Sequence, residues 1–178
     1  LAVIESEIKK HLRYGGKVLG ICGGFQMLGE TIDDELGIEG KPGTSPALGL
    51  LDCQTVLLKE KQLRNVQGNI SFSDTLVKGY EIHAGVTEGA DLVRPVILSE
   101  KGKDGAINKD NTVMGTYWHG LFSEADALAD ILAWAGLESD LRVDLNEIRE
   151  TQIDRLADTF EQAVNLESIM GILEHTKK

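Results

Sequence analysis

The sequence has few of the residues that mark several large protein classes. It contains only two cysteines, Cys22 and Cys53, in 178 residues, which excludes a secreted scaffold held together by disulfides. No apolar run approaches the length that crosses a bilayer, and residues 1–10 lack the apolar core of a signal peptide. We therefore expect a protein of a reducing, cytoplasmic compartment that does not enter a membrane.

Basic residues are also in short supply. Lysine and arginine number 18 against 29 acidic residues, which gives a formal net charge of −11. Nonspecific binding to nucleic acid needs a basic surface, so the composition argues against it. Hydrophobic residues make up 42% and charged residues 26%, as in ordinary globular proteins, and the length suits one α/β domain.

The spacing of apolar residues predicts the elements of that domain. Helices are predicted over residues 2–12, 25–36, 125–135, 146–164 and 166–175. Strands are predicted over 17–21, 51–58, 65–72, 79–83, 93–98 and 113–118, with polar turns at 102–105 and 109–111. Mixed helices and strands of this kind indicate an α/β fold with helices flanking a sheet.

The order of these elements is unusual at the beginning of the chain. A doubly wound domain has several βα units ahead of its nucleophile turn, whereas here only one helix and one strand come first. We therefore expect the sheet to be incomplete on its N-terminal side, and the chain to be part of a longer protein.

A turn at residues 20–24, GICGG, carries the first candidate for chemistry. It places Cys22 between a predicted strand and a predicted helix, the setting of a nucleophile elbow. The glycines allow close approach of neighbouring chain, and a helix N-terminus favours a thiolate and presents N–H groups to an oxyanion. A buried structural cysteine is the alternative interpretation. Cys53 lies in a strand-like run without such a setting, and we interpret it as structural.

A cysteine nucleophile needs an imidazole that the fold brings close. Of the four histidines, His119 ends a predicted strand, and functional groups gather at the carboxyl edge of an open α/β sheet. We therefore predict His119 as the base; a capping histidine held by backbone groups is the alternative. Glu81 and His83 share one face of a predicted strand, and they are either polar lining of the site or a satisfied pair at a sheet edge.

Residues 20–29, GICGGFQMLG, resemble the nucleophile segment of the class I, or triad, glutamine amidotransferases, and most of all the cobyric acid synthase branch. Segments at 48–52, 79–83, 115–122 and 149–157 agree with the same branch in the same order. The resemblance spans nearly the whole chain and is therefore specific. It implies a three-layer, flavodoxin-like mixed sheet with flanking helices, with residues 1–178 forming one partial glutaminase domain.

The resemblance also implies a chemistry. Cys22 would attack glutamine to form a γ-glutamyl thioester, and His119 would transfer the protons. Gly23 would supply one oxyanion N–H, and Gln26 matches a family position near the substrate. The expected substrate-binding set is Gly23, Gly24, Gln26, Glu81 and His83.

The implied partners are glutamine, a synthetase domain and a corrinoid. Ammonia would pass to an ATP- and magnesium-using synthetase domain, located upstream in the full-length protein. That domain would amidate adenosylcobyrinic acid a,c-diamide in cobalamin biosynthesis. No cofactor and no metal are expected in the glutaminase domain, and the sequence has no phosphate-binding glycine loop.

The sequence departs from the wider class in two ways. Many triad enzymes carry a glutamate two residues after the histidine, but Leu121 stands there, as in the cobyric acid synthase branch. Glu81, Glu124 or a backbone carbonyl could orient His119 instead. The family's second oxyanion donor lies upstream of the first residue here, so we expect this chain alone to hydrolyse little glutamine.

Other interpretations remain. A related amidotransferase for another acceptor, such as cobyrinate or a cell-wall lipid intermediate, would use the same glutaminase chemistry. A catalytically silent docking module would suit the missing orienting acid, although Cys22, Gln26 and His119 are all present. A cysteine peptidase of similar fold is the weakest alternative, because Gln26 has no role there.

Overall fold

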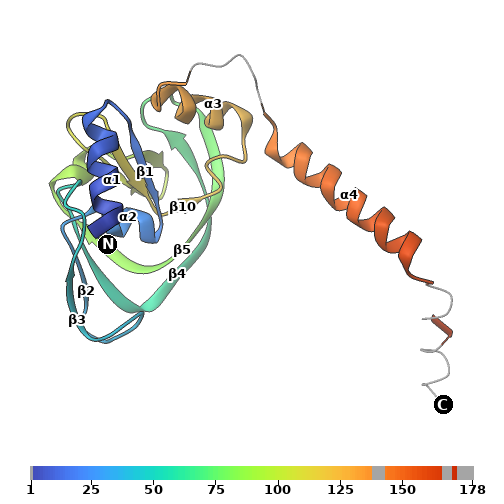
Figure 1. Cartoon of the computed structure of the whole chain (residues 1–178), viewed down its shortest axis with the longest axis horizontal. Helices are drawn as coiled ribbons and strands as arrows, with labels where there is room; N and C mark the ends of the chain where they lie inside the picture. Colours follow the sequence, from blue (N-terminus) through green and yellow to red (C-terminus); the bar gives the residue numbers. More distant parts are fainter. Residues whose placement is uncertain (1, 138–142, 166–169, 172–178) are drawn as a thin grey trace. The chain divides into compact units, whose positions relative to one another are not determined.

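A computed structural model describes residues 2–137, 143–165 and 170–171. The chain divides into two compact units, Leu1–Val143 and Asp144–Lys178. Figure 1 shows the elements of each unit.

The first unit contains three α-helices, one 3-10 helix and ten strands among the described residues. The helices are α1 (Ala2–Arg13), α2 (Gly23–Leu28), η1 (Ala90–Val93) and α3 (Ala125–Trp134). The strands are β1 (Val18–Ile21), β2 (Thr31–Asp34), β3 (Gly43–Pro46), β4 (Gln54–Ile70), β5 (Leu76–Glu88), β6 (Ile97–Ser99), β7 (Gly102–Asp104), β8 (Ala106–Ile107), β9 (Val113–Thr116) and β10 (Trp118–His119).

The strands form two sheets. The smaller sheet has the order β1-β9-β8, with β1 parallel to β9 and β8 antiparallel to it. The larger sheet follows the order β10-β5-β4-β2-β3, and β6 and β7 extend it from β4. Its β4–β5 hairpin is long and curves beside the smaller sheet (Figure 1). Among the residues that the structure describes, β1 pairs with β9 alone.

Two apolar clusters lie on the two faces of β9, all four of whose residues are buried. Val113 packs with Phe25 of α2, and Ile8 and Leu12 of α1 cover that cluster. Met114 faces the other cluster, which contains Trp118 and the α3 residues Ile131 and Trp134. A strand that is buried on both faces does not alternate between apolar and charged residues, which explains the sequence VMGT of β9. The predicted mixed α/β fold with flanking helices is confirmed.

Several predicted boundaries are wrong. The helix predicted over 25–36 ends at Leu28, and β2 follows it. The acidic run after β2 is a turn in which the carboxylate of Asp34 accepts hydrogen bonds from three backbone N–H groups, those of Ile38, Glu39 and Gly40. Side-chain acceptors of this kind compete with a helix for the backbone, and the β-branched Thr31 and Ile32 favour a strand.

The strands predicted over 51–58 and 65–72 are one strand, β4, which continues through the charged residues between them. Its pairing with β5 shifts register between Leu57 and Gln62, as at a β-bulge. The strand predicted over 93–98 begins as η1 and reaches strand geometry only at Ile97, whereas the turn predicted at 102–105 contains β7.

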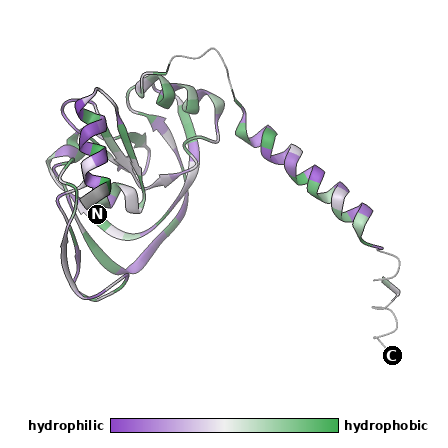
Figure 2. Ribbon diagram, in the orientation of Figure 1, coloured by the Kyte–Doolittle hydropathy of each residue, from purple (hydrophilic) through white to green (hydrophobic). Residues whose placement is uncertain are grey.

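The second unit contains α4 (Leu145–Ala163), as predicted. The Asp144 side chain caps it by accepting from the N–H groups of Asn146 and Glu147. Apolar and hydrophilic residues alternate along α4 (Figure 2). Apart from residues 170–171, which are helical, the helix predicted over 166–175 lies outside the described residues.

Candidate active site

Cys22 occupies the turn between the end of β1 at Ile21 and the start of α2 at Gly23. Its backbone angles are φ 55° and ψ −115°. Within the described ranges only Asp74 and Asn111 also have positive φ without being glycine, and these residue types tolerate it. Cysteine has no such tolerance, so the fold holds Cys22 in a strained conformation typical of a nucleophile elbow.

The glycines beside Cys22 differ in how much space surrounds them. A Cβ atom on Gly20 would lie 2.5 Å from Cδ1 of Leu28 and 2.7 Å from the carbonyl carbon of Gly24. Only glycine therefore lets α2 turn back over the end of β1. A Cβ atom on Gly23 or Gly24 would meet nothing within 4 Å. The expectation of close approach on both sides of the nucleophile thus holds for Gly20 and is wrong for Gly24.

The first backbone hydrogen bonds of α2 run from Phe25 and Gln26 to the carbonyl of Cys22. Within the described part of the chain, the N–H groups of Gly23 and Gly24 have no backbone acceptor. Free N–H groups at this position are suited to an oxyanion, as the sequence predicts for Gly23.

The Cys22 side chain is half-buried and contacts the larger sheet. Its thiol donates to the carbonyl oxygen of Ile82 on β5, with Sγ and O 3.4 Å apart. Cys53 provides the contrast, because it is 1% exposed. Burial, together with the charges of Asp91, Asp52 and Glu30, raises the pKa of its thiol to about 12. Cys53 is thus kept neutral in a core, which agrees with a structural role.

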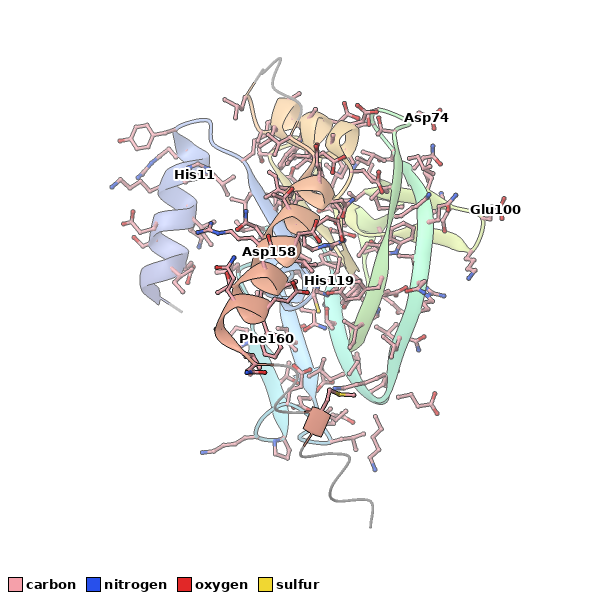
Figure 3. The ribbon with its side chains drawn as sticks, turned by 90° about the vertical axis from the view of Figure 1, so that its right-hand side faces the viewer. His11, Asp74, Glu100, His119, Asp158 and Phe160 are labelled. Atoms are coloured by element: carbon pink, nitrogen blue, oxygen red, sulfur yellow. The ribbon has the colours of Figure 1, made fainter. Side chains whose placement is uncertain are left out.

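His119 reaches the same strand from β10, where it pairs with Tyr80 of β5. The imidazole stacks on the Tyr80 ring at a centroid distance of 4.8 Å and an angle of 4°. Its Nε2 atom is buried and has no hydrogen-bond partner among the described residues. Figure 3 marks His119 well apart from His11, which lies on α1 and contacts the carbonyl of Lys17.

The structure therefore brings Cys22 and His119 to one short stretch of β5. Their contacts, Ile82 and Tyr80, are two residues apart, which is roughly 7 Å along a strand. No hydrogen bond joins the sulfur to the imidazole within the described residues. Catalytic contacts are often loose before substrate binds, so this placement suits a nucleophile and its base.

Glu81 and His83 form the predicted pair on one face of β5. His83 Nε2 lies 2.6 Å from Glu81 Oε1, and Arg64 Nε donates to Glu81 Oε2 at 2.6 Å. Burial alone would raise the pKa of Glu81, but the bonds from Arg64 and His83 outweigh it and lower the pKa. Register places Glu81 opposite Trp118 and Tyr80 opposite His119. Glu81 thus lies on the face of β5 away from His119 and does not orient it in this structure.

Gln26 lies on α2, where its backbone N–H donates to the carbonyl of Cys22, and its side chain is buried, at 7% exposed. Its Nε2 atom donates to the hydroxyl of Tyr117 at 3.4 Å. The Tyr117 ring stacks on His83 at a centroid distance of 3.6 Å. Tyr117 was not predicted as a site residue, although its position two residues before His119, in the GTYWHG segment, offered a signal.

Asp104 is a second residue that the sequence did not reveal, because its segment reads as a turn. The Thr116 hydroxyl donates to its carboxylate, as does the Tyr117 N–H at 3.3 Å. Burial raises the pKa of Asp104 to about 6, against these hydrogen bonds, which favour the charged form. Asp104 therefore changes charge close to neutral pH beside the Tyr117 backbone.

A cavity of about 1010 Å³ opens on the face of the β4–β5 hairpin that carries Glu81. Arg64, Glu81, Asp104 and Trp118 line it, together with lysines of β5 and β7. Cys22 and His119 are not among its lining residues. No group of three histidine, cysteine or acidic side chains in the described residues could hold a metal ion. No described helix is both long and apolar enough to pass through a membrane.

The sequence matches the family of CobB/CobQ-like glutamine amidotransferase domains over residues 2–127. The chain belongs to that family. The matched range begins in α1, includes Cys22 and His119, and ends in α3. The chain is therefore a glutamine amidotransferase domain, and glutamine is its substrate.

Proposed function

We propose that this domain is the glutaminase of a cobyric acid synthase, with Cys22 as nucleophile and His119 as base. The observation that carries the proposal is the strained conformation of Cys22 at a strand-to-helix turn, with His119 against the same strand. Membership of the CobB/CobQ-like family supports the glutaminase chemistry.

In the proposed reaction the thiol of Cys22 gives its proton to His119, and the sulfur attacks the side-chain amide carbon of glutamine. The N–H of Gly23 stabilises the oxyanion. The carbon–nitrogen bond then breaks as His119 returns the proton, which releases ammonia and leaves a γ-glutamyl thioester. Water attacks the thioester, with His119 as base, and glutamate leaves as the thiol is restored.

The rest of the substrate-binding set follows from the same proposal. Gly23 and Gly24 leave open space next to the nucleophile turn, because a Cβ atom on either would meet no protein atom within 4 Å. Glutamine would occupy that space, with Gln26 beneath it. Glu81 and His83 lie on the other face of β5 and would act on the substrate through Tyr117 and Gln26.

The acceptor belongs to the same proposal. A synthetase domain that uses ATP and magnesium would receive the ammonia and amidate adenosylcobyrinic acid a,c-diamide. The resemblance at residues 79–83 and 118–122 favours this acceptor over cobyrinate or a cell-wall lipid intermediate. In a mixture of all three acceptors with ¹⁵N-amide glutamine and ATP, we expect the protein that carries both domains to label the corrinoid diamide. Labelling of another acceptor instead would rule out this assignment.

The glutaminase step has a test that does not require full turnover. A diazoketone analogue of glutamine should alkylate Cys22, and free glutamine should protect it. Cys22→Ala should abolish the added mass, whereas the matched control Cys53→Ala should leave it unchanged. Alkylation that survives Cys22→Ala, or that glutamine does not slow, would contradict the proposed site and favour a silent docking module.

A further inference from the structure

A chain of polar contacts leads from the cavity on the β4–β5 hairpin to Gln26. Arg64 is half-exposed, lines the cavity and bonds the buried carboxylate of Glu81 at 2.6 Å. Glu81 in turn bonds His83, whose ring lies on Tyr117. The Tyr117 hydroxyl accepts from the amide of Gln26. The chain of contacts thus begins at the half-exposed Arg64 and ends at Gln26 on α2, the helix that follows the nucleophile turn.

Both nitrogens of His83 are occupied by acceptors. Nε2 faces Glu81, and Nδ1 faces the carbonyl oxygen of Gly85 at 2.6 Å. These two contacts hold the imidazole ring at both of its nitrogens. The ring stacks on the Tyr117 ring at an angle of 14°. Glu81 and His83 therefore fix the plane of the Tyr117 ring.

The remaining contacts of Tyr117 fix its hydroxyl. The hydroxyl lies 2.6 Å from Thr87 Oγ1, and the ring meets Phe25 edge-on at 5.1 Å. A Cβ atom on Gly85 would lie 2.5 Å from Nε2 of Gln26, so the Gln26 amide is held closely between β5 and Tyr117.

We propose that Tyr117 is a positioning residue for the glutamine site, which it serves by holding the Gln26 amide, and that Arg64, Glu81 and His83 hold Tyr117 in place. This inference rests on the proposed function, because Gln26 meets glutamine only within it. The ring of Tyr117 supplies the packing, whereas the hydroxyl alone contacts Gln26. Tyr117→Phe therefore removes the positioning contact and keeps the apolar contacts.

The test measures two properties of Cys22 in the whole chain. The first is the glutamine concentration that halves its alkylation by the diazoketone analogue. The second is its alkylation rate with iodoacetamide, which needs no glutamine site. For Tyr117→Phe we expect the protective concentration to rise between about threefold and tenfold, the value of one lost hydrogen bond. The iodoacetamide rate should stay within about twofold of wild type. Tyr14 is exposed, so Tyr14→Phe is the matched control and should change neither the protective concentration nor the iodoacetamide rate.

The outer contacts have a test of their own. Arg64→Gln should raise the protective concentration in the same direction, and Arg64→Lys should restore it by keeping a cation beside Glu81. An unchanged value in Tyr117→Phe, or an equal fall in the iodoacetamide rate, would overturn the positioning role. An unchanged protective concentration in Arg64→Gln would overturn the proposal that Arg64, Glu81 and His83 hold Tyr117 in place. Failure of glutamine to protect the wild-type chain would instead overturn the proposed function, so the two failures are distinguishable.

Discussion

A Cβ atom on Gly79 would overlap the carbonyl oxygen of His119. The two residues lie on β5 and β10, whose register pairs His119 with the next residue, Tyr80. The absence of a side chain at position 79 thus allows β10 to pair closely with β5, which places the imidazole against the Tyr80 ring.

Gly79→Ala should push β10 away from β5 and displace His119. We expect the free energy of unfolding to fall by about 1–3 kcal/mol, as in other overpacked sites. Modification of Cys22 by the glutamine analogue should slow by more than about tenfold, because displacement of a catalytic group by about 1 Å has effects of this size in other active sites. Gly40→Ala adds a methyl group that meets no atom within 4 Å and serves as the control. Equal behaviour of the two variants would contradict the expected role of Gly79.

The nucleophile turn offers a matched pair of glycines. Gly20→Ala brings a methyl group against Leu28 and the backbone of Gly24, and should cost about 1–3 kcal/mol of stability in urea unfolding. Gly24→Ala places its methyl group in open space within α2, where alanine favours the helix, and should be neutral or stabilising. A larger loss of stability from Gly24→Ala than from Gly20→Ala would show that the close approach is assigned to the wrong residue.

Cys22 itself is expected to lower the stability of the domain. Its φ of 55° and ψ of −115° suit glycine and strain any residue with a Cβ atom. Both Cys22→Gly and Cys22→Ala remove the sulfur, but only glycine removes the strain. We expect Cys22→Gly to be more stable than Cys22→Ala by about 1–2 kcal/mol in chemical denaturation, with neither variant alkylated by the glutamine analogue. Equal stabilities would indicate a relaxed turn.

Asp104 should make stability depend on pH. Its folded pKa of about 6 lies above that of an unfolded aspartate, near 3.9, so the fold binds its proton more tightly. Stability is therefore greatest below the unfolded pKa and is lost as pH rises through about 6.

Asp104→Asn cannot acquire the charge and keeps an oxygen for the N–H of Tyr117. Relative to wild type, we expect this variant to gain on the order of 2 kcal/mol between pH 4 and pH 8. Urea unfolding at both pH values measures the gain. A difference that does not change with pH would mean that Asp104 has an ordinary pKa in the folded chain.

The position of Cys22 followed from local sequence, because a nucleophile turn is encoded within five residues, GICGG. The strand predicted over 113–118 is instead divided between β9 and β10, so His119 lies in the larger sheet and not at the end of β9. The pairing of Glu81 with His83 followed from alternation along one strand, and it is confirmed. What alternation did not give is the face of β5 relative to His119, which depends on the register between β5 and β10.

The contacts of Tyr117 and Asp104 could not be derived from the sequence for a different reason. Gln26 and Tyr117 are 91 positions apart, and the contact exists only because the parallel pairing of β1 with β9 brings α2 beside Tyr117. The boundaries of β2, β4 and β7 were likewise set by neighbours in the sheet, which gave strand geometry to charged or glycine-containing segments.

The sulfur and the imidazole come from different parts of the fold, yet both rest against β5, at Ile82 and at Tyr80. A common support has a mechanical consequence. When the β4–β5 hairpin bends or twists as a rigid body, the Cys22 sulfur and the His119 imidazole move together, and the distance between them is conserved. A distortion of β5 between Tyr80 and Ile82 would change that separation. The side chain at the centre of that stretch is Glu81, clamped from the opposite face by Arg64 and His83.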